Sequence, residues 1–181
     1  MNSRVVPIVL LAAFAVLIGV FAKGLNPDRN KNELPSAYLE RQAPAFDLPS
    51  LTRPGERVST DDFAGEMVLV NVWATWCEGC RLEHPYLMEL AATGEIPIYG
   101  INWRDNREQA LVWLDRFGDP YVDSAFDADA RVGIDWGVYA APETFLVDGN
   151  RVVLKKHLGP MSPAVWEEKF LPVIEANGGA E

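Results

Sequence analysis

One apolar run that ends at the chain's only two cysteines constrains the fold more than any other feature. Residues 67–73 read Met-Val-Leu-Val-Asn-Val-Trp, and the cysteines follow as Cys77 and Cys80. A run that is apolar at nearly every position predicts a central parallel strand, covered on both faces. A helix is predicted from about Cys77, so the pair lies where a buried strand meets a helix N-terminus. Two cysteines at this spacing and place indicate a redox dithiol.

Two other interpretations of the cysteine pair stay open. A structural disulfide that closes only four residues removes little chain entropy from the unfolded state, so it contributes little stability. A zinc or copper site would use Cys77, Cys80 and His84, but the only other histidine is His157 and there is no second cysteine pair. The redox interpretation is therefore favoured, and we expect neither a metal nor a cofactor.

The N-terminal residues 1–23 predict a membrane anchor. Val5 to Ala22 carries no charge, and as a helix it would span about 27 Å, against about 30 Å for a hydrocarbon core. Residues 24–43 form a polar tether, and residues 44–177 form the globular domain. We expect a single-pass, uncleaved anchor with the domain outside the cytoplasm. A signal peptide cleaved after Ala22 is the alternative.

The remaining segments alternate between strand and helix patterns. Strands are predicted at 46–48, 67–73, 96–103, 121–123, 144–147 and 152–154. Helical segments are predicted at 60–63, from 77, at 106–117, 129–134 and 162–177. On the helix from Cys77, the inner side is expected to carry Leu82, Tyr86, Leu87 and Leu90. The order predicts an α/β fold with a mixed sheet and helices on both faces.

The formal net charge of −10 argues against a nucleic-acid partner, because phosphates would be repelled. Acidic residues are dense in one stretch, where Arg131 is the only basic residue. They are Asp123, Asp127, Asp129, Asp135, Glu143 and Asp148. If they gather around the dithiol, they would steer basic partners toward it.

The placement of the cysteines predicts how they react. Cys77, at a helix N-terminus, forms a thiolate more easily and attacks a substrate disulfide. Cys80, one turn further on, resolves the mixed disulfide and releases the reduced product. The carboxylate of Glu78 opposes the helix effect and raises the pKa of the Cys77 thiol, which favours electron donation. Trp76 is expected to cover one side of the pair.

Three stretches resemble one family, the membrane-anchored DsbE/CcmG thiol:disulfide interchange proteins of cytochrome c maturation. They are residues 73–80, Trp-Ala-Thr-Trp-Cys-Glu-Gly-Cys, residues 80–85, Cys-Arg-Leu-Glu-His-Pro, and residues 137–148, Gly-Val-Tyr-Ala-Ala-Pro-Glu-Thr-Phe-Leu-Val-Asp. The resemblance covers about residues 44–176 and implies a thioredoxin-like mixed β-sheet flanked by helices. The chain departs from the family at Glu78-Gly79, where Pro-Thr is common. That departure should change the reduction potential and partner preference more than the fold.

The resemblance also implies roles for the loop that ends at Pro142. Its peptide bond is expected to be cis and to lie against the dithiol, which would expose backbone for an extended substrate segment to pair with. Tyr139 and Ala141 in this loop, together with Trp76, are expected to contact the substrate. Acidic residues near the site correspond to Glu83 and Glu143. One of these is expected to relay a proton when Cys80 acts.

The function implied is a reductant on the periplasmic side of a bacterial inner membrane. Its partners would be apocytochrome c, whose Cys-x-x-Cys-His haem sites must be reduced, or the maturation proteins, and a membrane electron donor would re-reduce the dithiol. Three alternatives stay open. They are a general periplasmic disulfide reductase, a copper metallochaperone using Cys77, Cys80 and His84, and a non-catalytic haem- or partner-binding module.

Overall fold

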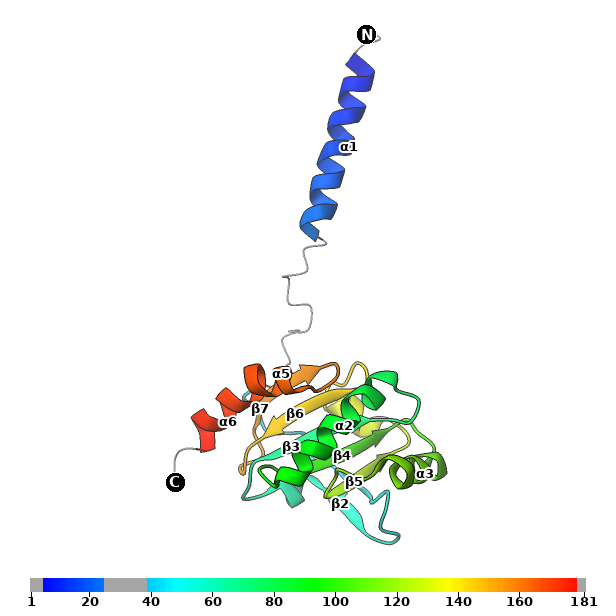
Figure 1. Cartoon of the computed structure of the whole chain (residues 1–181), viewed down its shortest axis with the longest axis vertical. Helices are drawn as coiled ribbons and strands as arrows, with labels where there is room; N and C mark the ends of the chain where they lie inside the picture. The colour runs from blue at the N-terminus through cyan, green and yellow to red at the C-terminus, as the bar shows by residue number, and fades with distance from the viewer. Residues whose placement is uncertain (1–4, 25–38, 179–181) are drawn as a thin grey trace. The chain divides into compact units, whose positions relative to one another are not determined.

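A computed structural model describes residues 5–24 and 39–178 (Figure 1). The chain divides into two units, Met1–Lys31 and Asn32–Glu181. The described part of the first unit is helix α1 (Val5–Gly24). Among the described helices, none combines the length and apolar character needed to cross a membrane. Most of the predicted tether, at 25–38, lies outside the described residues.

The second unit is built around a five-stranded sheet in the order β5-β4-β3-β6-β7. β3 (Val68–Trp73), β4 (Ile98–Trp103) and β5 (Asp123–Asp127) run parallel to one another. β6 (Glu143–Val147) is antiparallel to β3, and β7 (Val153–Leu158) is antiparallel to β6. β3 is therefore the central strand, and all its residues are buried. The predicted mixed sheet and its central strand are confirmed.

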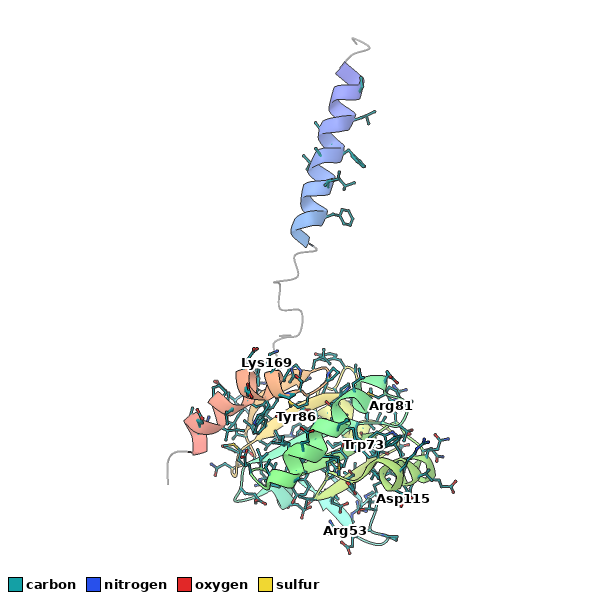
Figure 2. All side chains as sticks on the ribbon, viewed as in Figure 1. Arg53, Trp73, Arg81, Tyr86, Asp115 and Lys169 are labelled. Carbon is teal, nitrogen blue, oxygen red and sulfur yellow. A yellow bond between two sulfur atoms is a disulfide. The ribbon has the colours of Figure 1, made fainter. Side chains whose placement is uncertain are left out.

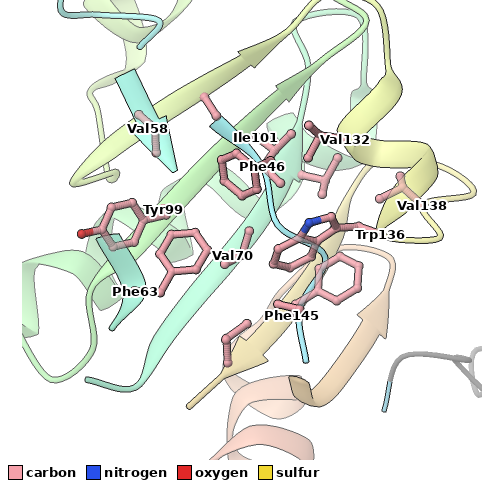
Figure 3. Packing of buried hydrophobic residues seen from close by; sticks show 14 of the residues in the cluster. Phe46, Val58, Phe63, Val70, Tyr99, Ile101, Val132, Trp136, Val138 and Phe145 are labelled. Carbon is pink, nitrogen blue, oxygen red and sulfur yellow. The ribbon is translucent and has the colours of Figure 1, made fainter. Parts of the chain in front are cut away.

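The side chains of β3 alternate between two apolar layers, which explains why the strand is apolar throughout. Val68, Val70 and Val72 point into one layer, whereas Leu69 and Trp73 point into the other. Figure 3 shows the first layer, whose labelled aromatic members are Phe46, Phe63, Tyr99, Trp136 and Phe145. The second layer lies under α2 and α3, so the sheet is covered on both faces.

Helices α2 (Glu78–Thr93) and α3 (Arg107–Phe117) begin where the sequence predicted them. Asn106 caps α3 by accepting a hydrogen bond from the backbone N–H of Gln109 at 3.0 Å. The expected inner position of Leu82 is wrong, because its side chain is 68% exposed. The buried stripe of α2 is Cys80, Glu83, His84, Leu87 and Leu90. Leu82 is off this stripe by one residue, about 100° of helix rotation.

The third parallel strand lies two residues later than predicted. The pattern at 121–123 indicated the strand, but β5 spans Asp123–Asp127 and the short helix α4 (Arg131–Asp135) follows it. Asp123, Ser124 and Asp127 are polar yet buried, so the sequence pattern does not show how far the strand extends. Their partners are remote in sequence, as when Ser50 Oγ donates to Asp123 Oδ1 at 2.7 Å.

The N-terminal edge of the second unit is a two-stranded hairpin. β1 (Asp47–Pro49) pairs antiparallel with β2 (Arg57–Ser59), and the 3-10 helix η1 (Thr60–Phe63) follows as predicted. The segment before Pro44 pairs with the start of β7 in the five-stranded sheet. The N–H of Glu40 donates to the carbonyl of Val153 at 2.8 Å.

One helical segment closes the unit, near the position predicted for the last helix. It consists of α5 (Pro163–Val165), the π-helical turn η2 (Trp166–Phe170) and α6 (Leu171–Gly178). Ser162 caps it, its Oγ accepting from the N–H of Val165 at 3.3 Å. Trp166 and Phe170 are buried in the second layer. The segment therefore covers the same sheet face as α2.

Candidate active site

The two cysteines lie at the N-terminus of α2 and are joined by a disulfide. Cys77 is the N-cap residue, and its Sγ accepts a hydrogen bond from the backbone N–H of Cys80 at 3.0 Å. Both side chains are buried. In the reduced protein the helix dipole and this N–H favour a thiolate at Cys77. The structure therefore holds the pair in its oxidised form, with the geometry of a redox dithiol.

Asp105 holds the loop that leads from β3 to the dithiol. Its carboxylate accepts hydrogen bonds from the backbone N–H and the Oγ1 hydroxyl of Thr75, both at 2.6 Å. It also accepts from Asn102 Nδ2 at 3.0 Å. Next to Thr75, the indole Nε1 of Trp76 donates to the carbonyl of Arg104 at 3.0 Å, while 55% of the side chain stays exposed. Sequence reasoning missed Asp105, because its partner lies thirty residues away.

The Ala141–Pro142 peptide bond is cis, as the resemblance implied. Pro142 packs against Gly79, the residue before Cys80. The carbonyl of Pro142 accepts a hydrogen bond from the N–H of Gly159 at 2.9 Å, which ties the loop to the segment after β7. The structure therefore brings Pro142 to the dithiol turn from more than sixty residues away.

A groove of about 440 Å³ runs beside the dithiol. All three residues expected to contact the substrate line it, namely Trp76, Tyr139 and Ala141, together with Trp103, Arg104 and Ala140. Tyr139 is 68% exposed, so it and Trp76 present aromatic faces to a bound partner. The structure therefore gathers residues from three separate loops into one aromatic-rimmed site.

Glu83 lies buried one turn after Cys80, at the centre of a polar network. Asn71 Nδ2 donates to Glu83 Oε1 at 2.9 Å, and the N–H of Met161 donates to Oε2 at 2.7 Å. Asn71 Oδ1 in turn accepts from the Tyr121 hydroxyl at 2.9 Å. Burial raises the pKa of Glu83 to about 7, although the two hydrogen bonds oppose the rise. Glu83 is therefore poised to exchange a proton near neutral pH.

Glu143 is also buried, but its contacts fit an anchoring role and not the proton relay considered for it. Its Oε1 accepts from the N–H groups of Tyr139 at 2.8 Å and Ala140 at 3.3 Å. Its Oε2 lies 2.8 Å from Lys156 Nζ, which also donates to the carbonyl of Gly137 at 2.7 Å. Glu143 thus fixes the loop that carries the groove residues.

His84 is buried, and its ring contacts the end of α3. Its Nε2 lies 3.3 and 3.2 Å from the carbonyl oxygens of Phe117 and Gly118, and its ring packs against Trp113. Within residues 5–24 and 39–178, no group of three or more His, Cys, Asp or Glu side chains is arranged to hold a metal ion. In this structure Nε2 of His84 is therefore engaged by the end of α3.

Three of the six acidic residues between Asp123 and Asp148 are not available for steering. Asp123, Asp127 and Glu143 are buried, and each is bound inside the protein. Asp127, for example, accepts from the N–H of Gly133 at 2.8 Å at the start of α4. Only Asp129, Asp135 and Asp148 keep exposed surface with which to attract a basic partner.

A helix-capping disulfide at the end of a central parallel strand, with a cis-proline loop packed against it, defines a thioredoxin-like thiol:disulfide oxidoreductase. The family described as Redoxin matches residues 39–171. With relatives above 40% identity along nearly its whole length, the chain belongs to the DsbE family of thiol:disulfide interchange proteins. The resemblance to that family, and the thiol:disulfide oxidoreductase activity that it implied, are confirmed.

Two of these relatives show the extent of the match. The DsbE protein of Allochromatium vinosum is 42% identical over 171 residues, covering 94% of this chain and 93% of the relative. That of Escherichia coli K12 is 45% identical over 169 residues, covering 93% and 90%. A secreted thiol-disulfide isomerase from Corynebacterium glutamicum is similar in structure, with a TM-score of 0.64 and 27% identity over 74% of this chain and 86% of that one.

Proposed function

We propose that the protein reduces the disulfide of an apocytochrome c Cys-x-x-Cys-His site, or of a maturation protein that handles it. The observation that carries the proposal is the joint placement of the dithiol, Pro142 and the aromatic groove. A disulfide presented to Cys77 beside Pro142 leaves the neighbouring side chains of the substrate next to Trp76 and Tyr139. Flat side chains such as imidazole pack well against aromatic rings.

The reaction follows from the two sulfur positions. In the reduced protein, the Cys77 thiolate attacks one sulfur of the substrate disulfide, forming a mixed disulfide and releasing the first substrate thiolate. Cys80 then attacks the Cys77 sulfur as a thiolate, which forms the Cys77–Cys80 disulfide and releases the second substrate thiolate. Two electrons pass from the dithiol to the substrate. The structure corresponds to the end of this cycle, with the disulfide closed.

Glu83 is proposed to take up the proton that Cys80 loses before it attacks. The carboxylate lies on the same buried face of α2, one turn after Cys80. A group with a pKa near 7 both accepts and returns a proton at neutral pH, which is the property a general base needs. Asn71 and Met161 hold the carboxylate in place.

The N-terminal region is proposed to tether the domain to the periplasmic face of the inner membrane. Support comes from the uncharged run Val5 to Ala22, which is bounded by Arg4 and Lys23. In this arrangement residues 1–23 form the anchor, 24–43 the tether and 44–177 the redox domain. A membrane electron donor would then re-reduce the dithiol, since extracytoplasmic compartments keep such pairs oxidised.

Disulfide trapping in cells tests the proposed function. A Cys80→Ser variant cannot resolve the mixed disulfide, so we expect it to accumulate Cys77-linked apocytochromes c or maturation proteins. The Cys77→Ser, Cys80→Ser double variant should trap nothing. Capture of unrelated secreted proteins alone would indicate a general reductase. Full cytochrome production with Cys77→Ser would indicate a non-catalytic binding module.

The anchor is tested separately, by fractionation and protease treatment of spheroplasts. We expect the full chain to sediment with membranes after alkaline extraction, and its redox domain to be digested from outside. A chain lacking residues 1–23, exported by an unrelated cleaved signal, should be soluble. Recovery of the full chain in the soluble periplasmic fraction would show that the segment is cleaved or does not anchor.

A further inference from the structure

A second groove, of about 370 Å³, opens on the other side of the dithiol loop. Its lining includes Thr75, two residues before Cys77, and continues along α3 through Val112 and Trp113 to Phe117. The two grooves share no lining residue. Thr75 lines the second groove, and its neighbour Trp76 lines the first. Both grooves therefore reach the loop that leads to Cys77.

The groove is lined by apolar side chains that the fold leaves partly uncovered. Val112 is 67% exposed and Phe117 is 38% exposed. Single exposed apolar residues are ordinary on protein surfaces, whereas neighbouring ones in one groove mark an interaction site.

Two arginines flank the ring of Phe117. The guanidinium carbon of Arg116 lies 5.2 Å from the ring centroid, and that of Arg81, labelled on α2 in Figure 2, lies 5.9 Å from it. In the described part of the chain, neither has a carboxylate oxygen within 4.0 Å. The surface also carries Glu108, at the dithiol end of the groove. A chain with a net charge of −10 therefore presents a local positive site at one end of an apolar groove.

The floor of this groove is fixed before any partner arrives. The ring of His84 packs edge-on against Trp113 with centroids 4.3 Å apart. His84 Nε2 is within hydrogen-bonding distance of the carbonyl oxygens at the end of α3. A preformed site costs less conformational entropy on binding than one that must be ordered.

We propose that the α2–α3 face, formed by Arg81, Val112, Trp113, Arg116 and Phe117, docks a segment that carries a carboxylate among apolar side chains. The segment belongs to a protein whose disulfide reacts with Cys77, so the inference rests on the proposed reductase function. Guanidinium groups bind carboxylates in paired hydrogen bonds, and arginine beside aromatic residues is typical of interface centres. A basic segment would instead meet two guanidinium groups at the Phe117 end.

Charge reversal with a matched control tests this docking site. The Arg81→Glu, Arg116→Glu variant is compared with Arg41→Glu, Arg131→Glu, which changes the net charge equally at two other exposed positions. The probes are two synthetic peptides with the same Cys-Ala-Ala-Cys disulfide, one tailed with Leu-Glu-Phe-Glu and the other with Leu-Lys-Phe-Lys. The second-order rate of their reduction by each protein is measured at low and high salt.

We expect the Arg81→Glu, Arg116→Glu variant to reduce the acidic peptide about ten-fold more slowly at low salt, and high salt to shrink the difference. The control variant should slow that peptide about two-fold at most. Val112→Ser should also slow the acidic peptide, whereas Val122→Ser, at a 54% exposed position outside this face, should not. Equal rates for the two charge-reversed proteins, or no effect of Val112→Ser, would overturn the proposal.

Bis(2-hydroxyethyl) disulfide separates this inference from the proposed function. It is uncharged and has no tail to dock, so all variants should reduce it at the wild-type rate. If the wild type reduces this disulfide and both peptides equally well, the docking site fails while the reductase stands. If the wild type reduces none of the three, the reductase function fails and the docking proposal falls with it.

Discussion

Gly79 lies so close to Pro142 that a β-carbon at position 79 would come within 2.7 Å of the Cδ atom of the proline ring. The same β-carbon would lie 3.4 Å from Cγ of Pro160. Real side chains do not approach ring atoms at 2.7 Å, so the glycine is needed for the loop to pack here. The second residue of the unusual Glu78-Gly79 pair therefore has a structural explanation.

A methyl group at position 79 should destabilise the oxidised protein. Gly79→Ala forces either Pro142 or the first turn of α2 to move, and overpacking of this kind costs about 1–3 kcal/mol. Urea unfolding of the oxidised variant, compared with wild type, measures the loss. Gly178→Ala is the matched control, because nothing lies within 4 Å of its β-carbon. Equal stability of Gly79→Ala and wild type would show that the proline loop yields freely.

Glu83 should make the oxidised protein less stable as pH rises from about 4.5 to 7. The pKa of Glu83 is about 7 in the folded protein, against an ordinary value of 4.5, so the native state holds a proton that the unfolded state has already released. The free energy of unfolding then falls across this window, by up to about 3 kcal/mol from this group. Because the cysteines are joined in a disulfide, they do not contribute.

Replacing this carboxyl group tests that pH dependence. Glu83→Gln should flatten the slope of unfolding free energy between pH 4.5 and 7, even if the altered hydrogen bonds lower stability at every pH. Glu108→Gln, at an exposed site, should keep the wild-type slope. Chemical denaturation at five or six pH values gives both slopes. A Glu83→Gln slope equal to that of wild type would contradict the assignment.

The buried Glu143–Lys156 pair gives a third prediction. Glu143→Gln keeps an oxygen for the N–H groups of Tyr139 and Ala140 but leaves the Lys156 ammonium, which is 9% exposed, without its counter-charge. Breaking such a pair costs about 3–5 kcal/mol. The double variant Glu143→Gln, Lys156→Met should recover part of the loss. If the double variant is no more stable than Glu143→Gln alone, the ion pair is not the cause.

The fold could be predicted from sequence wherever local patterns carry the information. Residues 67–73 are apolar on both faces, and that alone identifies the central strand β3. The bounds of β5 could not be found in this way, because Asp123 and Asp127 are polar residues buried in a strand. What makes their burial possible is contact with remote groups, such as Arg53 Nε, which donates to Asp123 Oδ2 at 3.0 Å across seventy residues.

The same distinction holds for the candidate site. Local sequence motifs are enough to identify Cys77, Cys80 and Pro142 as site residues. Asp105 and Asn71 do not, because each acts through partners far away in the chain. Nor could the sequence separate Glu83 from Glu143. Only the structure shows that one is held by neutral donors while the other faces an ammonium group.

Glu78, the exposed first residue of α2, should tune the dithiol through its charge alone. In the reduced protein its carboxylate opposes the thiolate at Cys77, so Glu78→Gln should lower the pKa of that thiol. A stabilised thiolate makes the dithiol a weaker electron donor, and the reduction potential should rise, by no more than about 30 mV for a change of one pKa unit. Thiolate absorbance against pH gives the pKa, and equilibration with glutathione buffers gives the potential.

Glu89→Gln, on an exposed position further along the same helix, is the control and should move neither quantity. An unchanged pKa and potential in Glu78→Gln would show that the carboxylate is fully screened by solvent, leaving Gly79 as the member of the pair that matters.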